Sequence, residues 1–347
     1  MDRESKLVER IARALPCQSG RSHESALRLG IGDDAAIVAS SGKKDWVLSC
    51  DAFLEGVHFL AKSHPPDSVG YKSLVRATSD LAAMGATPRF FLLTLAIPLS
   101  HTGAWLTGFL RGMARAARAM NVILLGGDTT KSGTVSISIT VIGEIARGHE
   151  VTRAGAHPGD LIYVSGTLGR AQLGLEILLN GSPRAKSLTE RNVNRVSGQE
   201  LRRLLRPHLH PAIKLDLGAW LAKHRIASAM MDISDGLSTD LARLCATSGV
   251  GAQIQSNSIP RVVLPKALSK HLKRPKLDPL KLALHGGEDY ELLFTVPPRN
   301  IRKLTKAPGF SQLAAIGEVT RGRSITLIGT DGSKKPLKSR GWDPFRS

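Results

Sequence analysis

Aromatic residues make up only 4% of this chain of 347 residues. Proteins that hold single-stranded nucleic acid usually stack its bases on aromatic side chains, so the composition disfavours that function. Cysteine is also scarce, because the chain contains only Cys17, Cys50 and Cys245 and they form no C-x-x-C pair. An odd number of cysteines without a disulfide framework indicates a reducing compartment.

The sequence also lacks a long apolar segment. Its longest apolar run, residues 90–99, is interrupted by Thr94 and Pro98 and is too short to span a bilayer. The first residues, M-D-R-E-S-K, contain no apolar core of the kind found in a signal peptide. We therefore expect a soluble cytoplasmic protein without membrane contacts.

Two common nucleotide-binding signatures are missing. No G-x-x-x-x-G-K-[ST] motif occurs, so the chain is not a P-loop protein. Gly30, Gly32 and Ala35 have the spacing of a dinucleotide fingerprint, but Asp33 and Asp34 would repel a pyrophosphate placed there. A dinucleotide-binding fold is therefore not expected.

Positive charge is abundant and unevenly distributed. The chain carries 48 Lys and Arg against 29 Asp and Glu, a net charge of +19. Residues 1–150 have a net charge of +3, and residues 151–347 have a net charge of +16. Because the basic residues are scattered, we interpret the excess as solvated surface. Nucleic-acid binding that weakens steeply with salt remains an alternative.

The hydrophobic content of 42% is enough for two domain cores. The patterns predict an α+β fold with a helix and loop at 1–28, one domain at 29–148 and a second at 149–347. Residues 135–142 alternate apolar and polar side chains, as a half-buried antiparallel strand does. We expect strands at 46–49, ending in Cys50 and Asp51, and at 122–125, running into a glycine-rich turn. The polar, basic stretch 180–206 is expected to be a mobile insertion.

Acidic residues recur at the ends of the expected strands and helices, next to Gly, Ser, Thr or Cys. The segment M-D-I-S-D-G-L at 231–237 is the most marked, with a buried strand before it and a helix after it. Helix capping explains one such turn, and the alternative to a shared site is a set of unrelated caps and turns. The acids concerned are Asp33, Asp34, Asp51, Asp80, Asp128, Asp232, Asp235, Glu288 and Asp289.

These acidic turns contain no Lys or Arg, so a cluster of them would require cations. Oxygen ligands without paired His or Cys select hard ions, above all Mg²⁺. Mg²⁺ is usually shared with substrate phosphates. The pattern therefore predicts phosphoryl transfer from a nucleotide.

Seven of these motifs resemble, in order and spacing, those of the thiamine-monophosphate kinase family. They are L-G-I-G-D-D-A, S-C-D-A-F-L-E-G-V-H-F, S-D-L-A-A-M-G-A-T-P, G-G-D-T-T, M-D-I-S-D-G-L, G-G-E-D-Y-E-L and I-G-E-V-T. The resemblance covers roughly residues 27–345. It implies two domains of the aminoimidazole ribonucleotide synthetase-like fold, with a C-terminal α/β domain, ATP between the domains and a homodimer formed through the N-terminal sheets.

The resemblance also implies roles for individual residues. Metal ligands fall on Asp34, Ser49, Cys50, Asp51, Asp80, Asp128, Asp232 and Asp235, with Asp33 adjacent. ATP contacts fall on Gly127, Asp128, Arg153 and Ser234, and contacts to thiamine monophosphate fall on His58, Glu288 and Trp342. A plain loop histidine, a surface arginine and a hydrophobic anchor are the alternatives for His58, Arg153 and Trp342.

Two positions depart from the family pattern. Cys50 replaces the threonine that commonly precedes Asp51, which is harmless if the residue binds metal through its carbonyl oxygen. Ala77 stands where relatives often have asparagine. The implied reaction is direct, Mg²⁺-assisted transfer from ATP to thiamine monophosphate, giving thiamine diphosphate. A phosphate monoester is largely dianionic near neutral pH, so no general base is needed.

Sister enzymes of the same fold are the nearest alternatives. Selenophosphate synthetase usually has a reactive N-terminal cysteine with a lysine partner, whereas Cys17 lies in P-C-Q-S-G. The hydrogenase maturation protein ends in a functional cysteine, whereas this chain ends in P-F-R-S. Both are disfavoured.

Overall fold

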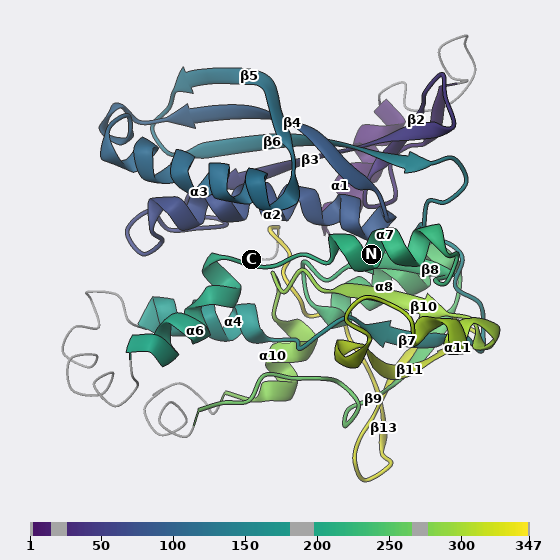
Figure 1. The fold of residues 1–347 in the computed structure, drawn as a ribbon. Coiled ribbons are helices and arrows are strands. Elements are labelled where there is room, and N and C mark those ends of the chain that lie inside the picture. Colours follow the sequence, from purple (N-terminus) through teal and green to yellow (C-terminus); the bar gives the residue numbers. More distant parts are fainter. Residues whose placement is uncertain (1–2, 15–25, 181–197, 266–276, 346–347) are drawn as a thin grey trace.

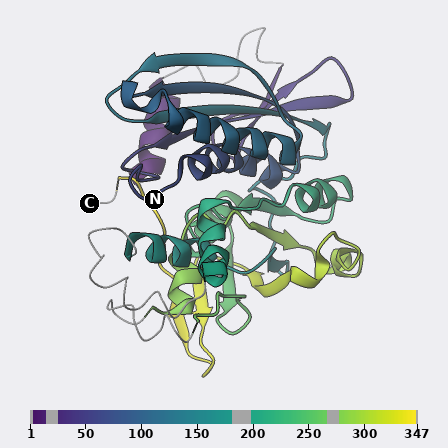
Figure 2. The same ribbon diagram turned by 60° about the vertical axis from the view of Figure 1, so that its left-hand side comes forward.

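The computed structural model describes residues 3–14, 26–180, 198–265 and 277–345. The chain forms two halves, each built on one β-sheet, and the halves lie face to face (Figures 1 and 2). Cys17 and most of the basic segment 264–281 lie outside the described residues. An α+β fold with two sheets is therefore confirmed.

The N-terminal half contains a six-stranded sheet in the order β1-β2-β3-β6-β4-β5. Its strands are β1 (Leu27–Leu29), β2 (Ala36–Ala39), β3 (Lys44–Leu54), β4 (Thr87–Ile97), β5 (Ile123–Lys131) and β6 (Ser136–Ala146). All neighbours are antiparallel except β4 and β5, which are parallel. The prediction of an antiparallel strand around residues 135–142 is confirmed by β6.

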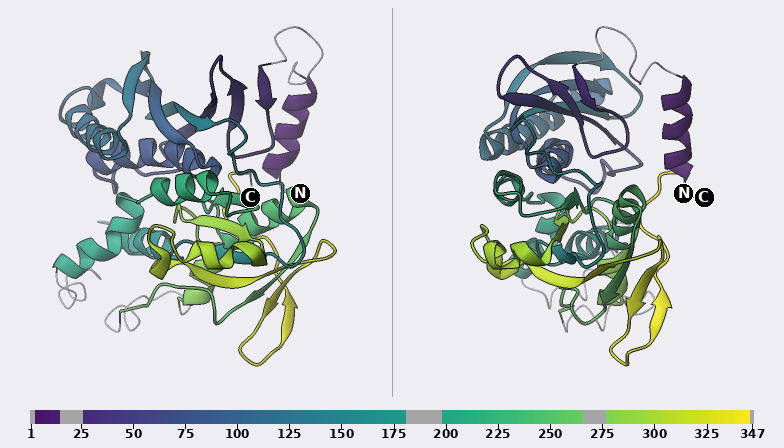
Figure 3. Two further views of the ribbon diagram at one scale, coloured as in Figure 1. Left: turned by 45° about the vertical axis from the view of Figure 1, so that its right-hand side comes forward. Right: turned by 90° about the vertical axis from the view of Figure 1, so that its right-hand side faces the viewer.

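Three helices accompany this sheet: α1 (Arg3–Ala14), α2 (Pro66–Met84) and α3 (Ala104–Met120), with a 3₁₀ turn at Leu99–His101. Helices α2 and α3 cover one face of the sheet, and α1 stands at the margin of the molecule (Figures 1 and 3). The polypeptide packs tightly here, since a Cβ on Gly70 of α2 would lie 2.0 Å from the carbonyl oxygen of Phe109 in α3. On the opposite face of the sheet, Ala52, Leu92 and Thr94 are exposed.

The C-terminal half contains a seven-stranded sheet in the order β13-β12-β9-β11-β7-β10-β8. Its strands are β7 (Leu161–Val164), β8 (Ala229–Asp232), β9 (Gly251–Gln255), β10 (Leu292–Val296), β11 (Ala314–Thr320), β12 (Ile325–Ile328) and β13 (Lys334–Pro336). Strands β8 and β10 are buried along their whole length, which explains why all their residues except Asp232 and Thr295 are apolar.

The helices of this half are α4 (Arg170–Asn180), α6 (Gly198–Leu209), α7 (Leu215–Lys223), α8 (Leu237–Ser248), α10 (Pro279–His285) and α11 (Ile301–Leu304), with 3₁₀ turns at Pro298–Asn300 and Phe310–Gln312. The expectation of a mobile insertion at 180–206 is wrong for its last part, because α6 packs against α4. Residues 181–197 lie outside the described chain.

Two strands are longer than the sequence patterns suggested. Strand β3 continues through Cys50 and Asp51 to Leu54, because each residue pairs with β6. Strand β5 continues through the expected glycine turn to Lys131, because its residues pair with β4. Both expected strand ends are therefore wrong, and the acids there project from strands.

Helix α2 joins the two halves. One hydrophobic cluster combines side chains of α2 with side chains of α7, β8 and β10. The approach of α2 to α7 is close at two glycines: a Cβ on Gly218 would lie 2.1 Å from the Ala82 carbonyl oxygen, and one on Gly85 would lie 2.3 Å from the Ala222 Cβ. Residues on this side of α2 therefore have defined positions relative to the C-terminal sheet.

Candidate functional site

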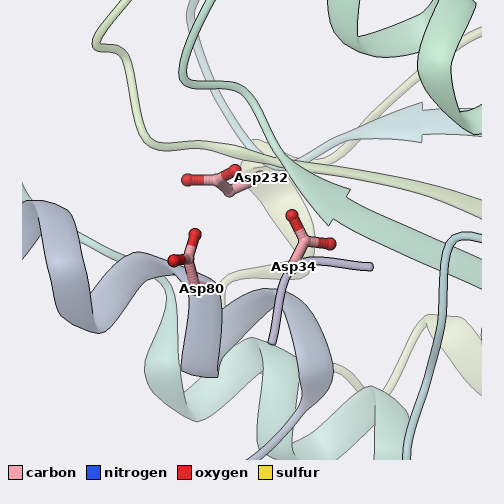
Figure 4. Close-up of side chains that lie close together, drawn as sticks. All are labelled: Asp34, Asp80 and Asp232. Atoms are coloured by element: carbon pink, nitrogen blue, oxygen red, sulfur yellow. The ribbon is translucent and has the colours of Figure 1, made fainter. Parts of the chain in front are cut away.

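Three of the expected acidic residues meet between the two halves. Asp34 comes from the loop before β2, Asp80 from α2 and Asp232 from the end of β8 (Figure 4). One carboxylate oxygen from each lies within 4.8 Å of the others, close enough for a single metal ion to be shared. The cluster exists only because the halves pack together.

Each carboxylate in this acidic cluster, defined as Asp34, Asp80 and Asp232, has one polar neighbour. Ser49 of β3 donates its hydroxyl to Asp80, and Ser79 of α2 donates to Asp232 over 2.6 Å. The Arg153 guanidinium donates to one oxygen of Asp34 over 2.6 Å. The other oxygen, Oδ2, is buried and has no hydrogen-bond partner in the part of the chain that the structure describes. These contacts orient the carboxylates and leave acceptor capacity unused.

Burial and mutual repulsion make the fully charged cluster costly. Burial, followed by the charges of Asp51, Asp232 and Asp34, raises the pKa of Asp80 well above its ordinary value. Burial and the neighbouring Asp34 raise the pKa of Asp232 to about 7. A cation placed between these groups would relieve both effects.

The expectation that the acidic turns lack cationic partners is wrong for several of them. Arg153 pairs with Asp34, the Arg76 Nε lies 3.2 Å from the Asp51 Oδ2, and Arg243 pairs with Asp235. These cations come from other parts of the chain, so the turns themselves contain no sign of them. Of the three clustered acids, Asp80 and Asp232 have no ion pair among the described residues.

Strand alternation separates Cys50 from its neighbours. Because successive side chains of β3 point to opposite faces, Ser49 and Asp51 lie on the side of the sheet covered by α2. The Cys50 side chain is exposed on the other face, where its sulfur lies 3.5 Å from the Ser138 hydroxyl. Cys50 can therefore reach the acidic cluster only through its backbone, and its thiol leaves the cluster unaffected.

Asp128 is not brought to the acidic cluster. Asp128 of β5 pairs with Thr94 of β4, which pairs with Ser138 of β6, which in turn pairs with Ala52 of β3. Side chains of directly paired residues share one face of a sheet, and here it is the exposed face. The Asp128 carboxylate accepts a hydrogen bond from the Thr129 N–H. The preceding Gly127 fits against β4, where a Cβ would lie 1.8 Å from the Leu93 carbonyl oxygen. The metal and nucleotide roles of both residues stay predictions.

Two further acids, Asp33 and Asp289, have structural partners. The Asp33 carboxylate accepts from the backbone N–H groups of Asp34 and Arg153. The Asp289 carboxylate accepts from Gly169 and Ala171 at the start of α4, over 2.5 and 3.0 Å. Asp289 is therefore a helix cap, which is the alternative reading of an acidic turn.

Two of the residues expected to contact the substrate, Glu288 and Trp342, are hydrogen-bonded through their backbones to the turn 233–235. The Ser234 carbonyl oxygen accepts from the Glu288 N–H over 2.7 Å, and the Asp235 carbonyl oxygen accepts from the Trp342 N–H over 2.9 Å. The Trp342 side chain itself is largely exposed. The C-terminal tail and the G-G-E-D-Y segment are thus attached to the same turn that follows Asp232.

His58 is held as a neutral imidazole. Its Nδ1 accepts from the Leu54 N–H over 3.0 Å, and its ring stacks on Phe53. Burial, with the nearby charge of Arg76, lowers the pKa of His58 to about 4. A neutral ring at this position can donate from Nε2 but carries no charge at neutral pH.

Sequence reasoning missed a stripe of charged residues on α2. Lys72, Arg76 and Asp80 are spaced four residues apart and so share one face of the helix. Lys72 is fully buried and contacts Glu288, while Arg76 contacts Asp51. The sequence contained a signal for this stripe, because charged residues four positions apart in a largely apolar helix indicate that one face of the helix lies in a polar interface.

Among the described residues, no helix combines the length and the apolar character needed to cross a membrane.

Two family models match the chain. The N-terminal domain of AIR synthase related protein matches residues 32–145, and the C-terminal domain of the same family matches residues 157–330. The predicted boundary at residue 149 lies between these ranges and stays a prediction.

Curated relatives align along nearly the whole chain. Thiamine-monophosphate kinase of Escherichia coli strain K12 is 35% identical over 327 residues, covering 94% of each chain. The enzyme of the same name from Buchnera aphidicola subsp. Acyrthosiphon pisum is 38% identical over 319 residues, covering 91% of this chain and 92% of the relative.

Solved structures agree with these matches. The structure of AaThiL complexed with AMPPCP and TMP has a TM-score of 0.78 at 33% identity, covering 98% of this chain and 97% of that chain. Escherichia coli HypE, a hydrogenase maturation protein, shares the fold with a TM-score of 0.63 at 22% identity, covering 84% of this chain and 85% of that chain. By its domain matches and its relatives, the chain belongs to the AIR synthase related proteins and, among them, to the thiamine-monophosphate kinase family.

Proposed function

We propose that this protein transfers a phosphoryl group from ATP to thiamine monophosphate and forms thiamine diphosphate. The observation that carries the proposal is the acidic cluster between the halves, found in a chain whose relatives are thiamine-monophosphate kinases. A related structure holds AMPPCP and TMP together, which supports a site for two phosphorylated ligands.

The acidic cluster fits Mg²⁺. Its donors are carboxylate oxygens, and one of them, Asp34 Oδ2, is buried without a hydrogen-bond partner among the described residues. Asp34, Asp80 and Asp232 are the residues that would hold the ion. When bound there, Mg²⁺ would neutralise charge that develops on the transferring phosphate oxygens. Ser49, Cys50, Asp51, Asp128 and Asp235 stay predicted ligands.

Arg153 supports nucleotide binding at this place. Its guanidinium is half-buried beside Asp34, and no described residue forms a hydrogen bond with its buried Nε. An arginine held in this way presents a fixed positive charge to phosphate oxygens. Gly127, Asp128 and Ser234 are the other residues proposed to contact ATP.

The acceptor would lie near the turn 233–235, where Glu288 and Trp342 are attached. The exposed indole of Trp342 suits a cationic thiazolium ring. His58, neutral and fixed through Leu54, would contribute a hydrogen bond. Such fixed groups hold the acceptor phosphate in line with the donor, which accounts for a large part of the rate in reactions of this type.

The proposed mechanism is a direct, in-line transfer. The acceptor phosphate is largely dianionic near neutral pH, so it attacks without a general base. The chain's part is to orient the two phosphates and to exclude competing water. No phosphorylated form of the protein is expected. Covalent phosphate retained on denatured protein after single turnover with labelled ATP would contradict this mechanism.

The activity is tested by measuring ADP release with ATP and Mg²⁺ in the presence of thiamine monophosphate, free thiamine or no acceptor. We expect ADP only with the monophosphate, together with an equal amount of thiamine diphosphate. ADP without any acceptor would indicate a sister synthetase reaction. No ADP under any condition, with salt-sensitive nucleic-acid binding, would overturn the proposal.

We also propose a homodimer formed through the N-terminal sheet. Strand β5 is the edge strand of that sheet and is exposed along its whole length. It carries exposed Ile123, Leu124 and Leu125, and Leu92 of β4 is exposed beside it. An exposed apolar edge of this kind usually pairs with another chain, and a second copy is the partner that the family resemblance suggests.

A further inference from the structure

Lys72 is a buried cation that the proposed reaction does not use. Its side chain, on α2 of the N-terminal half, is only 1% exposed, and its Nζ lies 2.6 Å from the Glu288 Oε2 of the C-terminal half. An ammonium group without solvent is costly unless it is paired. Lys72 is therefore a fixed partner of Glu288.

Two histidines complete the surroundings of this ion pair. The His208 Nδ1 on α6 lies 3.2 Å from the Glu288 Oε2 and 3.4 Å from the Lys72 Nζ. The His64 Nε2 lies 3.0 Å from the His208 Nε2, and the His64 Nδ1 accepts from the Leu60 N–H. Burial, with the neighbouring cations, lowers the pKa of both histidines, so both rings are neutral at neutral pH.

The contacts of this network are compatible with a chain of hydrogen bonds that ends on Glu288. When the His208 Nδ1–H donates to Glu288, the His208 Nε2 accepts from the His64 Nε2–H, and the His64 Nδ1, 3.1 Å from both the N–H and the carbonyl oxygen of Leu60, accepts from that N–H. The Glu288 Oε2 then receives two donors, from Lys72 and His208. Although burial opposes it, Lys72 and His208 hold the pKa of Glu288 well below its ordinary value.

The backbone around Glu288 is held in an unusual conformation. Glu288 and Tyr290 have φ angles of 67° and 50°, in the left-handed region that residues with a Cβ rarely adopt. Backbone hydrogen bonds from both residues to Ser234 and Ile233 maintain it. Strain that is over-determined in this way is typical of functional segments.

Only one of the two carboxylate oxygens of Glu288 is bonded to described residues. The Oε2 is occupied by Lys72 and His208, whereas the Oε1 has no hydrogen-bond partner among the described residues. The side chain is 22% exposed. The carboxylate is thus fixed through one oxygen, and its other oxygen keeps its capacity to accept a hydrogen bond.

We propose that Lys72, supported by His208 and His64, is the positioning residue for Glu288 and keeps its free oxygen aimed at an N–H donor of the acceptor substrate. This inference rests on the proposed function, in which Glu288 contacts thiamine monophosphate. The aminopyrimidine of that substrate supplies such a donor. Lys72 acts on acceptor binding through Glu288 and has no contact with the nucleotide.

The test compares Lys72→Met, Glu288→Gln and the double variant in steady-state kinetics. We expect Lys72→Met to raise the KM for thiamine monophosphate by roughly tenfold or more, since Glu288 loses its fixed partner. The KM for ATP should stay within about twofold. The double variant should be no weaker than Glu288→Gln alone, because Lys72 then has nothing left to position. Exposed Lys62 supplies the matched control, Lys62→Met, which should behave as wild type.

An unchanged KM for the monophosphate in Lys72→Met, or effects of the two single variants that multiply, would overturn the inference. If Lys72→Met does not fold, His208 provides the second comparison. His208→Leu should raise the same KM, and His208→Asn, which keeps a donor near Nδ1, should restore it. Equal KM values in both His208 variants and the wild type would also overturn it. Wild-type protein that forms no thiamine diphosphate would instead overturn the proposed function.

Discussion

Asp80 is placed where burial and neighbouring carboxylates disfavour its negative charge. It lies among Asp34, Asp51 and Asp232, and one hydroxyl, that of Ser49, offsets its charge. Like charges in a buried site disfavour one another. This repulsion is an unfavourable term in the stability of the metal-free protein, and a cation bound at the proposed site would remove it.

Asp80→Asn should therefore abolish turnover without lowering the stability of the metal-free protein. In metal-free buffer we expect the variant to be at least as stable as the wild type, because an amide replaces one of the repelling carboxylates. At Mg²⁺ concentrations about 100-fold above its dissociation constant, the wild type should gain about 2.7 kcal/mol, and the variant should gain far less. Thermal unfolding with and without Mg²⁺ measures both effects, and turnover should be lost.

Asp216→Asn is the matched control, because Asp216 is exposed on α7. It should keep the full Mg²⁺-dependent stabilisation and normal turnover. If Asp80→Asn were stabilised by Mg²⁺ as strongly as the wild type, Asp80 would not belong to a metal site.

At the scale of elements, β5 shows how pairing can override local sequence. Its Gly-Gly-Asp segment suggested a turn, since glycine weakens strand interiors. In the structure the segment continues β5, because residues Gly126–Lys131 pair with β4. An edge strand tolerates glycine where another backbone approaches closely, and Gly127 is such a position.

Gly127→Ala should destabilise the protein independently of any ligand. A Cβ there would lie 1.8 Å from the Leu93 carbonyl oxygen, so β5 would have to move away from β4. Overpacking of this kind costs about 1–3 kcal/mol, which urea denaturation would measure. Gly133→Ala, at a position with no atom within 4 Å of the added Cβ, is the control and should change stability little. Equal stability of the two variants would contradict the tight β4–β5 contact.

At the scale of the whole molecule, the N-terminal sheet has one covered and one exposed face. Helices α2 and α3 occupy the first (Figure 1). The second presents Leu92 and Ile123, together with the Asp128 side chain. If a second copy covers this face, Asp128 would be buried in the assembly rather than exposed.

Ile123→Glu should dissociate the proposed dimer, because a charge on the apolar edge would be buried against the partner. We expect a shift from dimer to monomer in sedimentation velocity. Val263, which is 85% exposed in the C-terminal half, supplies the control Val263→Glu, and this variant should remain dimeric. A wild-type protein that sediments as a monomer would contradict the dimer itself.

The sequence alone predicted much of this protein. Periodicity predicted the α+β fold and the antiparallel strand around residues 135–142, since an alternating pattern depends on local geometry. The motifs at the acidic turns, through their resemblance to the thiamine-monophosphate kinase family, predicted the family that the curated relatives confirm. The metal-assisted phosphoryl transfer stays a prediction.

Only the tertiary structure decided which of these acids lie together. Asp34, Asp80 and Asp232 come from three elements that meet when α2 packs against the C-terminal half, while Asp289 caps a helix and Asp128 lies on the other side of a sheet. Local sequence patterns cannot distinguish a clustered acid from a helix cap or from an acid on the opposite face, because the residues next to each acid are of the same types. The pairing of Lys72 with Glu288 likewise depends on contact between residues far apart in the chain.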